Sequence, residues 1–329
     1  MNIKPLTWTT GISGYVLLAG AVVINIIMQG SRFFSAPNLS SLFSSNLPLI
    51  LAALAQMIVM LSGGIDISLG NIIALVNGIA ILTTNTFYFP VFAGWMIALM
   101  AGTFAGLVNG LVISYLRIPP LLVTFAMSTL IRGVALIVLP KPGGTVPVGL
   151  YRTYAGRILG IPTAVWLLVL VVLPLLLFAK FRFSRHLVAV GTNERNAYIS
   201  GINVNRVKVM SYVLGGFVAS LAGLCLTAFT ASGDVRIGES FALQSIAAVI
   251  IGGTLAGSGW RNYIGGTVCG AVFLAIVNNI VFFVFNAIAR NNPGIQISTF
   301  YQQLLSNLII IFGLASAVLT NSKQNNGGK

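Results

Sequence analysis

The sequence has very little charge and hardly any acid. Charged residues make up 7% of its 329 residues and only four are acidic, whereas soluble domains carry about 25% charged residues. A chain of this composition cannot cover a surface that faces water, so we interpret it as an integral membrane protein. Its mean hydropathy of +0.97 and its 57% hydrophobic residues predict an all-α, polytopic membrane fold.

The residues that most enzymes need are also scarce. His186 is the only histidine, and the acidic residues are Asp66, Glu194, Asp234 and Glu239. These are few groups for acid–base or metal chemistry, so we do not expect an enzyme, a metal site or a bound cofactor. The phosphate-binding pattern GxxxxGK[ST] is absent from the sequence. If ATP and magnesium are used, a separate ATPase chain must therefore bind them.

Cysteine is scarce as well. Cys225 and Cys269 lie in apolar runs without a metal-binding or disulfide spacing, and we interpret both as small buried residues. Basic residues, in contrast, are abundant, and the net charge is +14. In a membrane protein such an excess is typical of cytoplasmic loops, so we expect contact with the lipid bilayer and no nucleic acid.

Apolar segments fill most of the chain, and about ten of them approach the length needed to span a bilayer. They lie at 11–29, 46–62, 70–84, 93–114, 119–139, 163–181, 209–231, 240–256, 264–285 and 300–319. Several are short or rich in glycine, which leaves about eight or nine spans as the alternative. We interpret 1–329 as a single transmembrane domain, with its first apolar run retained as a helix.

The distribution of lysine and arginine predicts the orientation. With ten spans and a cytoplasmic N-terminus, eleven Lys and Arg fall in cytoplasmic segments and six in outer ones. This bias predicts cytoplasmic N- and C-termini. It also places the 180–208 segment in the cytoplasm and the Pro- and Gly-rich 140–162 loop in the periplasm.

The 180–208 segment is a basic, polar island between long apolar runs. Within it, 193–202 reads NERNAYISGI, which predicts a short helix that ends in a turn at Gly201. We expect a positive φ at this glycine. A compact projection of this kind on the cytoplasmic face suits contact with a soluble partner.

A second break, SGGIDISLG at 62–70, interrupts two apolar runs. Gly63 and Gly64 favour an interrupted helix. We predict that Asp66 caps a helix beginning near Ile67 at the membrane edge. The alternative is a polar region that lines a solute path, with Asp66, Ser68 and Asn71 as its candidates.

Polar residues elsewhere have weaker signals. Asp234, Arg236 and Glu239 are expected in one short outer loop, either as a solvated turn or, with Arg152, as a docking surface for an extracytoplasmic protein. Arg132 lies inside an apolar segment, where we expect it to snorkel or to pair. The Gly-rich stretch at 246–259 favours close helix packing.

Four segments together resemble the permease subunits of ribose-type ABC sugar importers, a family that also serves other monosaccharides, autoinducer-2 and some nucleosides. They are SGGIDISLG at 62–70, RIPPLLVTFAMSTLIRG at 117–133, AVGTNERNAYISGINVNRVK at 189–208 and IAAVIIGGTLAGSG at 246–259. The resemblance implies a helical permease of the bacterial inner membrane. It also implies a second permease subunit (identical or paralogous), a cytoplasmic ABC ATPase and a periplasmic solute-binding protein as partners.

By the same resemblance, 189–208 corresponds to the family's coupling loop, which seats in the ATPase. The residues that this assigns to the coupling interface are Gly191, Asn193, Glu194, Ala197, Ser200 and Gly201. Arg195 and Asn196 stand where the family usually has Glu and Ala.

The expected function is import of a monosaccharide, with a nucleoside or an autoinducer-type solute as the alternative. A low intramembrane charge fits a neutral cargo. An ion-coupled secondary transporter would need intramembrane carboxylates, for which Asp66 is the only candidate.

Overall fold

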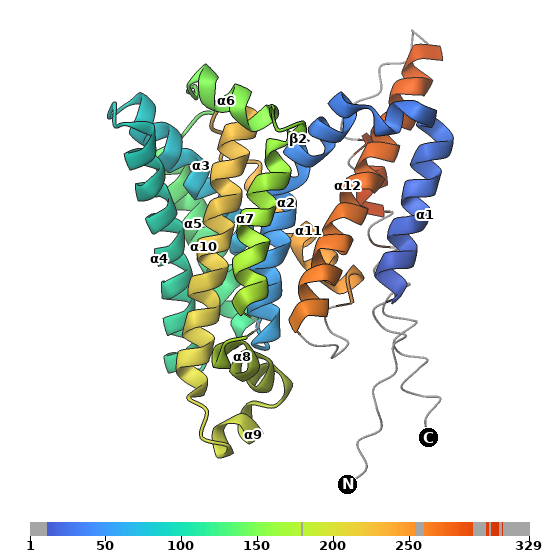
Figure 1. Ribbon diagram of the computed structural model, residues 1–329. Coiled ribbons are helices and arrows are strands. Elements are labelled where there is room, and N and C mark those ends of the chain that lie inside the picture. The colour runs from blue at the N-terminus through green and yellow to red at the C-terminus, as the bar shows by residue number, and fades with distance from the viewer. Residues whose placement is uncertain are drawn as a thin grey trace. The chain divides into compact units, whose positions relative to one another are not determined.

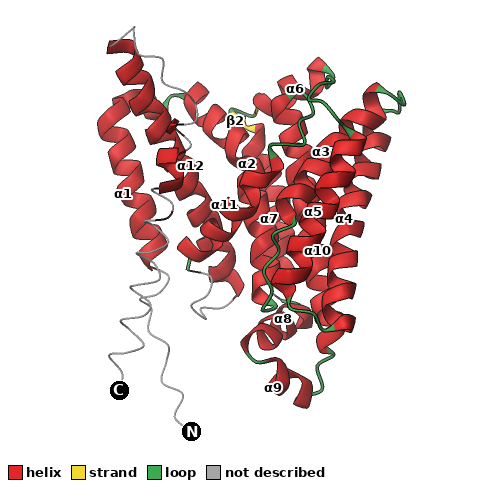
Figure 2. Cartoon of the chain, turned by 180° about the vertical axis from the view of Figure 1, so that it is seen from behind, coloured by secondary structure: helices red, strands yellow, loops and turns green. Residues whose placement is uncertain are grey.

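The computed structural model describes residues 12–178, 180–253, 260–291, 301–302, 304–308 and 311, and their backbone is mostly helical (Figure 2). In a bilayer an apolar run must satisfy its N–H and C=O groups internally, which an α-helix does. The predicted all-α membrane fold is confirmed.

The elements follow one another with short connections. In chain order they are α1 (Ile12–Gln29), η1 (Gly30–Phe34), α2 (Ala36–Leu61), α3 (Leu69–Asn85), α4 (Val91–Leu116), α5 (Pro120–Val138), α6 (Val148–Ala155), β1 (Arg157–Ile158), β2 (Ile161–Pro162), α7 (Thr163–Phe178), α8 (Arg182–Thr192), α9 (Glu194–Ile199), α10 (Val204–Thr230), α11 (Gly238–Ile251) and α12 (Trp260–Asn291).

The number of membrane spans differs from the prediction. Six described helices are long and apolar enough to cross a membrane, and a seventh results if α7 and α8 form one bent span. The helices α3 and α11 are apolar but have only 17 and 14 residues. The predicted count of about ten is therefore not confirmed, and most of the predicted 300–319 span and both chain ends lie outside the described residues.

Several helices extend past their predicted bounds. The helix α2 begins at Ala36 and not at 46, and α10 begins at Val204 and not at 209. Hydropathy marks where a segment leaves the hydrocarbon, whereas a helix ends only where its hydrogen bonding stops. Polar residues at these ends therefore continue the helix.

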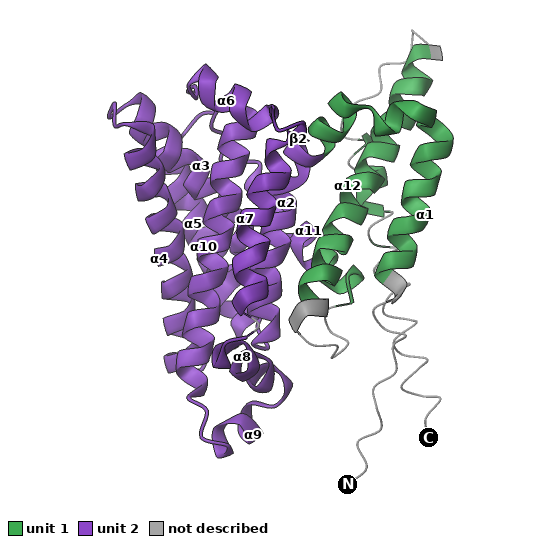
Figure 3. Ribbon diagram, viewed as in Figure 1, with its two compact units in different colours: residues 1–42, 247–329 green, residues 43–246 purple. Residues whose placement is uncertain are grey.

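The chain divides into two compact units, residues 1–42 with 247–329 and residues 43–246 (Figure 3). In the first unit α1 packs against α12. The Gln29 Nε2 donates to Asn279 Oδ1 at 2.7 Å, and the Asn25 Nδ2 donates to the Ile276 carbonyl at 3.4 Å. Amide groups thus join the two helices by hydrogen bonds.

The second unit is a bundle in which α10 packs against α4 and α3, and α5 against α3. Small residues bring α4 and α10 together, because a Cβ built on Gly216 would lie 2.8 Å from the Gly102 carbonyl oxygen and 3.0 Å from the Gly106 Cα. Close approach of this kind increases van der Waals contact between helices that have no water to exclude.

The two polar segments predicted for opposite sides lie at opposite ends of this bundle, one with α6 and the other with α8 and α9 (Figure 1). At the α6 end, Asn85 joins α3 to the 140–162 segment. Its Nδ2 donates to the Thr145 carbonyl at 2.8 Å, and its Oδ1 accepts from the Thr145 N–H at 3.0 Å.

This arrangement predicts labelling from opposite sides of a membrane. Single cysteines replacing Thr145 and Asn203, both exposed, are placed in a chain with alanine at Cys225 and Cys269. An impermeant maleimide should label Thr145→Cys only in right-side-out vesicles and Asn203→Cys only in inverted ones. Leu54→Cys, which is fully buried, is the unlabelled control. Labelling of both exposed positions from one side would contradict the topology.

Candidate functional site

A short helix projects from one end of the bundle and forms what we call the knob, residues 193–202. The helix α9 begins after Asn193, whose Oδ1 accepts from the Asn196 N–H at 2.9 Å. This cap satisfies one of the N–H groups that a helix leaves free at its start. Asn203 caps the start of α10 in the same way, through the Arg206 N–H at 3.0 Å.

The knob ends in a Schellman motif. The Gly201 N–H donates to the Tyr198 carbonyl at 2.9 Å, and the Ile202 N–H donates to the Ala197 carbonyl at 3.1 Å. Gly201 has a φ of +81°, which confirms the expected positive φ. A Cβ here would meet nothing within 4 Å, so the backbone conformation alone selects glycine. Both ends of α9 are therefore fixed by local hydrogen bonds.

The outer surface of the knob is partly apolar. Tyr198 is 73% exposed and Ile199 is 72% exposed, whereas Ala197 is buried against the rest of the knob. The carboxylate of Glu194 pairs with the Lys208 ammonium at 2.6 Å and so ties α9 to α10. Large apolar side chains held out from a rigid turn are typical of a surface that another protein covers.

A cavity of about 1150 Å³ lies beside the knob. Its other wall is the turn between α4 and α5, which includes Arg117 and Pro119. The knob therefore stands clear of the bundle on one side.

Gly191 has a different position from the other predicted coupling residues. It lies at the end of α8, and a Cβ built on it would overlap the Leu61 carbonyl and lie 3.1 Å from the Gly63 nitrogen. Its backbone thus contacts the break that follows α2. Asn193, Glu194, Ser200 and Gly201 are exposed on the knob, and the coupling role of all these residues stays a prediction.

The break contains a buried polar network at Asp66. The Asp66 Oδ1 accepts from the Ser68 N–H at 2.8 Å and from the Ser68 Oγ at 2.6 Å. The Asn109 Nδ2, from α4, donates to the Ser68 Oγ at 2.7 Å and reaches Asp66 Oδ2 at 3.5 Å. All three side chains are fully buried.

The structure bears on the predicted cap in two ways. Asp66 does accept from a free N–H group at the start of the next helix, that of Ser68, but α3 itself begins at Leu69, two residues later than predicted. The backbone first turns at Gly63, whose φ is +83°, and this turn delays the helix. Asp66 is also enclosed by α4 and not placed at an exposed edge, because Asn109 and Ser68 satisfy its oxygens inside the bundle.

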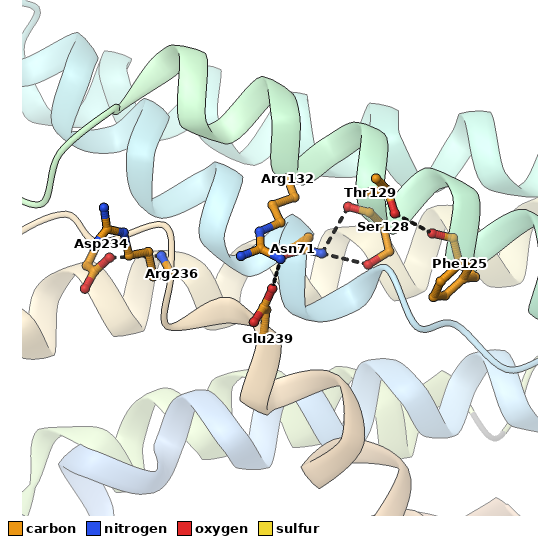
Figure 4. Close-up of polar contacts among 8 residues, drawn as sticks. All are labelled: Asn71, Phe125, Ser128, Thr129, Arg132, Asp234, Arg236 and Glu239. Carbon is orange, nitrogen blue, oxygen red and sulfur yellow. Dashed lines mark hydrogen bonds and ion pairs between the residues drawn. The ribbon is translucent and has the colours of Figure 1, made fainter. Parts of the chain in front are cut away.

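Asn71 joins α3 to α5. Its Nδ2 donates to the Ser128 carbonyl at 3.0 Å and to the Ser128 Oγ at 2.7 Å (Figure 4). Asn71 is 5% exposed and Ser68 is fully buried. The structure therefore brings the candidate path residues together at the start of α3, in the interior of the unit, and a role of Asp66, Ser68 and Asn71 in a solute path stays a prediction.

An ion pair close to Asn71 agrees with one of the two alternatives expected for Arg132, but its partner was not predicted. The Arg132 guanidinium on α5 pairs with the carboxylate of Glu239 in the first turn of α11 (Figure 4). A carboxylate is favoured there by the helix dipole. The only signal in the sequence was that each residue is the single charge in an apolar helix, and a pairing partner cannot be read from that.

The segment before α11 begins at the expected outer end, where Gly233 exchanges backbone hydrogen bonds with Gly143 at 2.9 Å. From Asp234 it runs inward along α3, because the Asp234 N–H donates to Asn77 Oδ1 at 2.7 Å and a Cβ on Gly238 would overlap the Gly70 carbonyl. Gly70 lies about 22 Å along the helix axis from Asn85, where α3 ends. Glu239 is thus far from the α6 end, where Arg152 lies exposed.

The apolar bundle, with its capped projection and buried polar break, defines a multi-pass helical membrane protein, and comparison with known proteins gives its family. A family described as "Branched-chain amino acid transport system / permease component" matches residues 38–314. The chain belongs to the ribose-type ABC sugar permease family.

Three relatives illustrate this membership. The ribose import permease protein RbsC of Escherichia coli (strain K12) is 31% identical over 94% of this chain and 93% of the relative. RbsC of Bacillus subtilis (strain 168) is 34% identical over 83% and 81%. The autoinducer 2 import system permease protein LsrC of Salmonella choleraesuis (strain SC-B67) is 31% identical over 79% and 76%.

The Asp66 network predicts a stability effect. Asp66→Ala removes the acceptor of two hydrogen bonds from Ser68 and should lower the free energy of unfolding by about 1–3 kcal/mol, because the buried Ser68 N–H loses its partner. Melting of the purified protein measures the change. Thr129→Ala, on an exposed surface, should change stability by less than about 0.5 kcal/mol. If Asp66→Ala abolished transport with unchanged melting, the carboxylate would serve the solute path and not the fold.

Proposed function

We propose that this chain is the permease subunit of an ATP-driven importer that carries a monosaccharide across the bacterial inner membrane. The observation that carries the proposal is the similarity to a ribose import permease over more than nine tenths of both chains. A substrate does not follow from family membership alone, since a relative named for autoinducer 2 import is also 31% identical. Autoinducer 2 is therefore the second candidate cargo.

The interior of the bundle supports a neutral, hydroxyl-rich cargo. Its buried polar side chains on α3 and α4 are mostly amides and hydroxyls, among them Asn71, Asn77 and Asn109. Such groups donate and accept hydrogen bonds without net charge. An ionic cargo would instead require compensating charges in a low-dielectric setting.

The knob is the proposed contact with a separate ATPase, which would bind the ATP and magnesium. Its ends are fixed by the Asn193 cap and by the Gly201 turn. A movement of the ATPase would therefore displace the knob as a rigid body. The exposed Tyr198 and Ile199 supply apolar surface for the partner. Basic residues around it suit the inner leaflet and an acidic rim on the partner.

The remaining partners follow from the same proposal. A solute-binding protein would dock at the α6 end, where Arg152 is exposed. Docking by Asp234 and Arg236 stays a prediction, and Glu239 is not included because it pairs with Arg132. A second permease subunit, identical or paralogous, would complete the path.

Reconstitution tests the proposed function. The chain is purified with the subunits that accompany it and placed in liposomes with the solute-binding protein outside. We expect uptake of radiolabelled ribose that requires ATP on the ATPase side and persists when ionophores collapse ion gradients. Autoinducer 2 and a nucleoside are measured in parallel to rank the cargoes. Uptake without ATP that ionophores abolish would instead identify a secondary transporter.

Substitutions in the knob should impair coupling to the ATPase and leave folding intact. Gly201→Val should strain the turn by about 1–2 kcal/mol, since a β-branched residue resists a positive φ. Glu194→Lys should replace an ion pair by repulsion with Lys208. Both variants should insert and assemble, and both should lose solute-stimulated ATP hydrolysis.

Two matched variants are the controls. Gly201→Asn should retain coupling, because asparagine tolerates the left-handed region. The double variant Glu194→Lys/Lys208→Glu should recover part of the activity by restoring the pair. Wild-type stimulation in both Gly201→Val and Glu194→Lys would mean that the knob is only a connector.

A further inference from the structure

A half-exposed ion pair lies on the surface of the bundle. The side chains of Arg132 and Glu239 are 50% and 53% exposed. On the opposite side of α5, the apolar Leu130 is 58% exposed and Val134 is 42% exposed. Figure 4 shows the pair between α5 and the start of α11, beside Asn71 of α3.

The pair lies within the thickness of the bundle and not at its end. Arg132 is about 18 Å along α5 from Pro120 and about 9 Å from Val138. Glu239 follows Gly238, whose backbone contacts Gly70 near the start of α3. The hydrocarbon core of a bilayer is about 30 Å thick, so this level is inside it.

The backbone beside the pair is irregular. Residues 234–237 are not helical and run inward along α3 to this level, and Arg236 within them is exposed. Irregular backbone at membrane depth is tolerated only where it is buried in protein or lines water. Exposed charges at the same depth follow the same rule, because a charge facing lipid is costly. Protein or water must therefore cover this surface, and the exposed charges of Arg132, Arg236 and Glu239 favour water.

We propose that the Arg132–Glu239 pair lines the aqueous path of the solute and contacts its hydroxyl groups. This inference rests on the proposed function. The guanidinium can donate to two neighbouring hydroxyl oxygens, and the carboxylate can accept from hydroxyl hydrogens. The two charges cancel, so the pair offers strong hydrogen bonds to a neutral polyol and no net attraction for an ion. Thr129 and Ser240, both exposed beside the pair, add hydroxyl groups.

Cysteine labelling tests whether the surface is wet. Thr129→Cys lies one turn from Arg132, and Ser240→Cys adjoins Glu239. Leu130→Cys is the control, because it points about 200° away from Arg132 around the same helix. All are placed in the complex with its ATPase, with alanine at Cys225 and Cys269.

A charged methanethiosulfonate reagent should modify Thr129→Cys and Ser240→Cys but not Leu130→Cys, and saturating ribose should slow the modification. If neither Thr129→Cys nor Ser240→Cys reacts from either side of the membrane, with or without ATP, lipid or another protein surface covers the pair and the proposal is overturned.

Transport measurements test contact with the solute. Arg132→Lys keeps the charge but loses the planar fork, and Glu239→Gln keeps the shape but loses the charge. Each should reduce ribose uptake by about tenfold, the loss of one charge-assisted hydrogen bond. Assembly and melting should be unchanged, because a half-exposed pair adds little stability.

The double variant Arg132→Glu/Glu239→Arg distinguishes contact with the solute from a purely structural link between α5 and α11. It restores the ion pair but exchanges the donor and acceptor positions, so uptake should stay low. Recovery to the wild-type rate would show that the pair only joins α5 to α11, and would overturn the proposal. If the cysteine variants are labelled as expected but the wild-type complex takes up no ribose, the proposed cargo would be wrong. The inference that water reaches the pair would still hold.

Discussion

The constraint on which this structure depends is that each backbone polar group inside the bundle needs a partner within the protein. Helices meet it along the apolar runs. Where the chain leaves the helical path, side chains provide the partners: Asp66 accepts from the Ser68 N–H in the break after α2, and Asn77 accepts from the Asp234 N–H in the segment before α11. The same constraint explains why the polar side chains of the interior are mostly amides and hydroxyls, which are able to serve the backbone without adding a charge.

The two irregular segments meet at the start of α3. The break at 62–68 leads into this helix, and 234–237 runs along it until Gly238 contacts Gly70. Small residues at this crossing allow two backbones to touch where a single Cβ would overlap a carbonyl. As a result Asn71, Ser128, Arg132 and Glu239 come together from three helices that are distant in the sequence (Figure 4). A polar centre in an apolar bundle thus arises from helix packing, and its members are single polar residues in otherwise apolar segments.

The features that could be predicted from the sequence are those with local causes. Composition predicted the membrane class, and glycine after a short polar helix predicted the turn at Gly201, since both depend on neighbouring residues. The family resemblance was confirmed by comparison. Asp66 was correctly predicted to accept from an N–H group at a helix start, but the start was placed two residues too early, because the Gly63 turn moves it to Leu69. The inward course of 234–238 along α3 was not predicted, because hydropathy does not distinguish a polar loop in solvent from an irregular segment held along a helix. The pairing of Arg132 with Glu239 joins residues far apart in the chain, and no local pattern encodes it.

Gly191 links the knob to the Asp66 network more directly than any side chain could. The end of α8 and the break after α2 touch backbone to backbone, at Leu61 and Gly63. Side chains can absorb a small displacement by changing rotamer, but two main chains in van der Waals contact cannot. A displacement of α9 would be transmitted through α8 to the turn at Gly63. From there it would reach Asp66, which accepts from the Ser68 N–H at the start of α3. The stiffness of this connection would therefore be set by close backbone packing, and one added methyl group at Gly191 would be enough to push α8 away from the break, because it would overlap the Leu61 carbonyl.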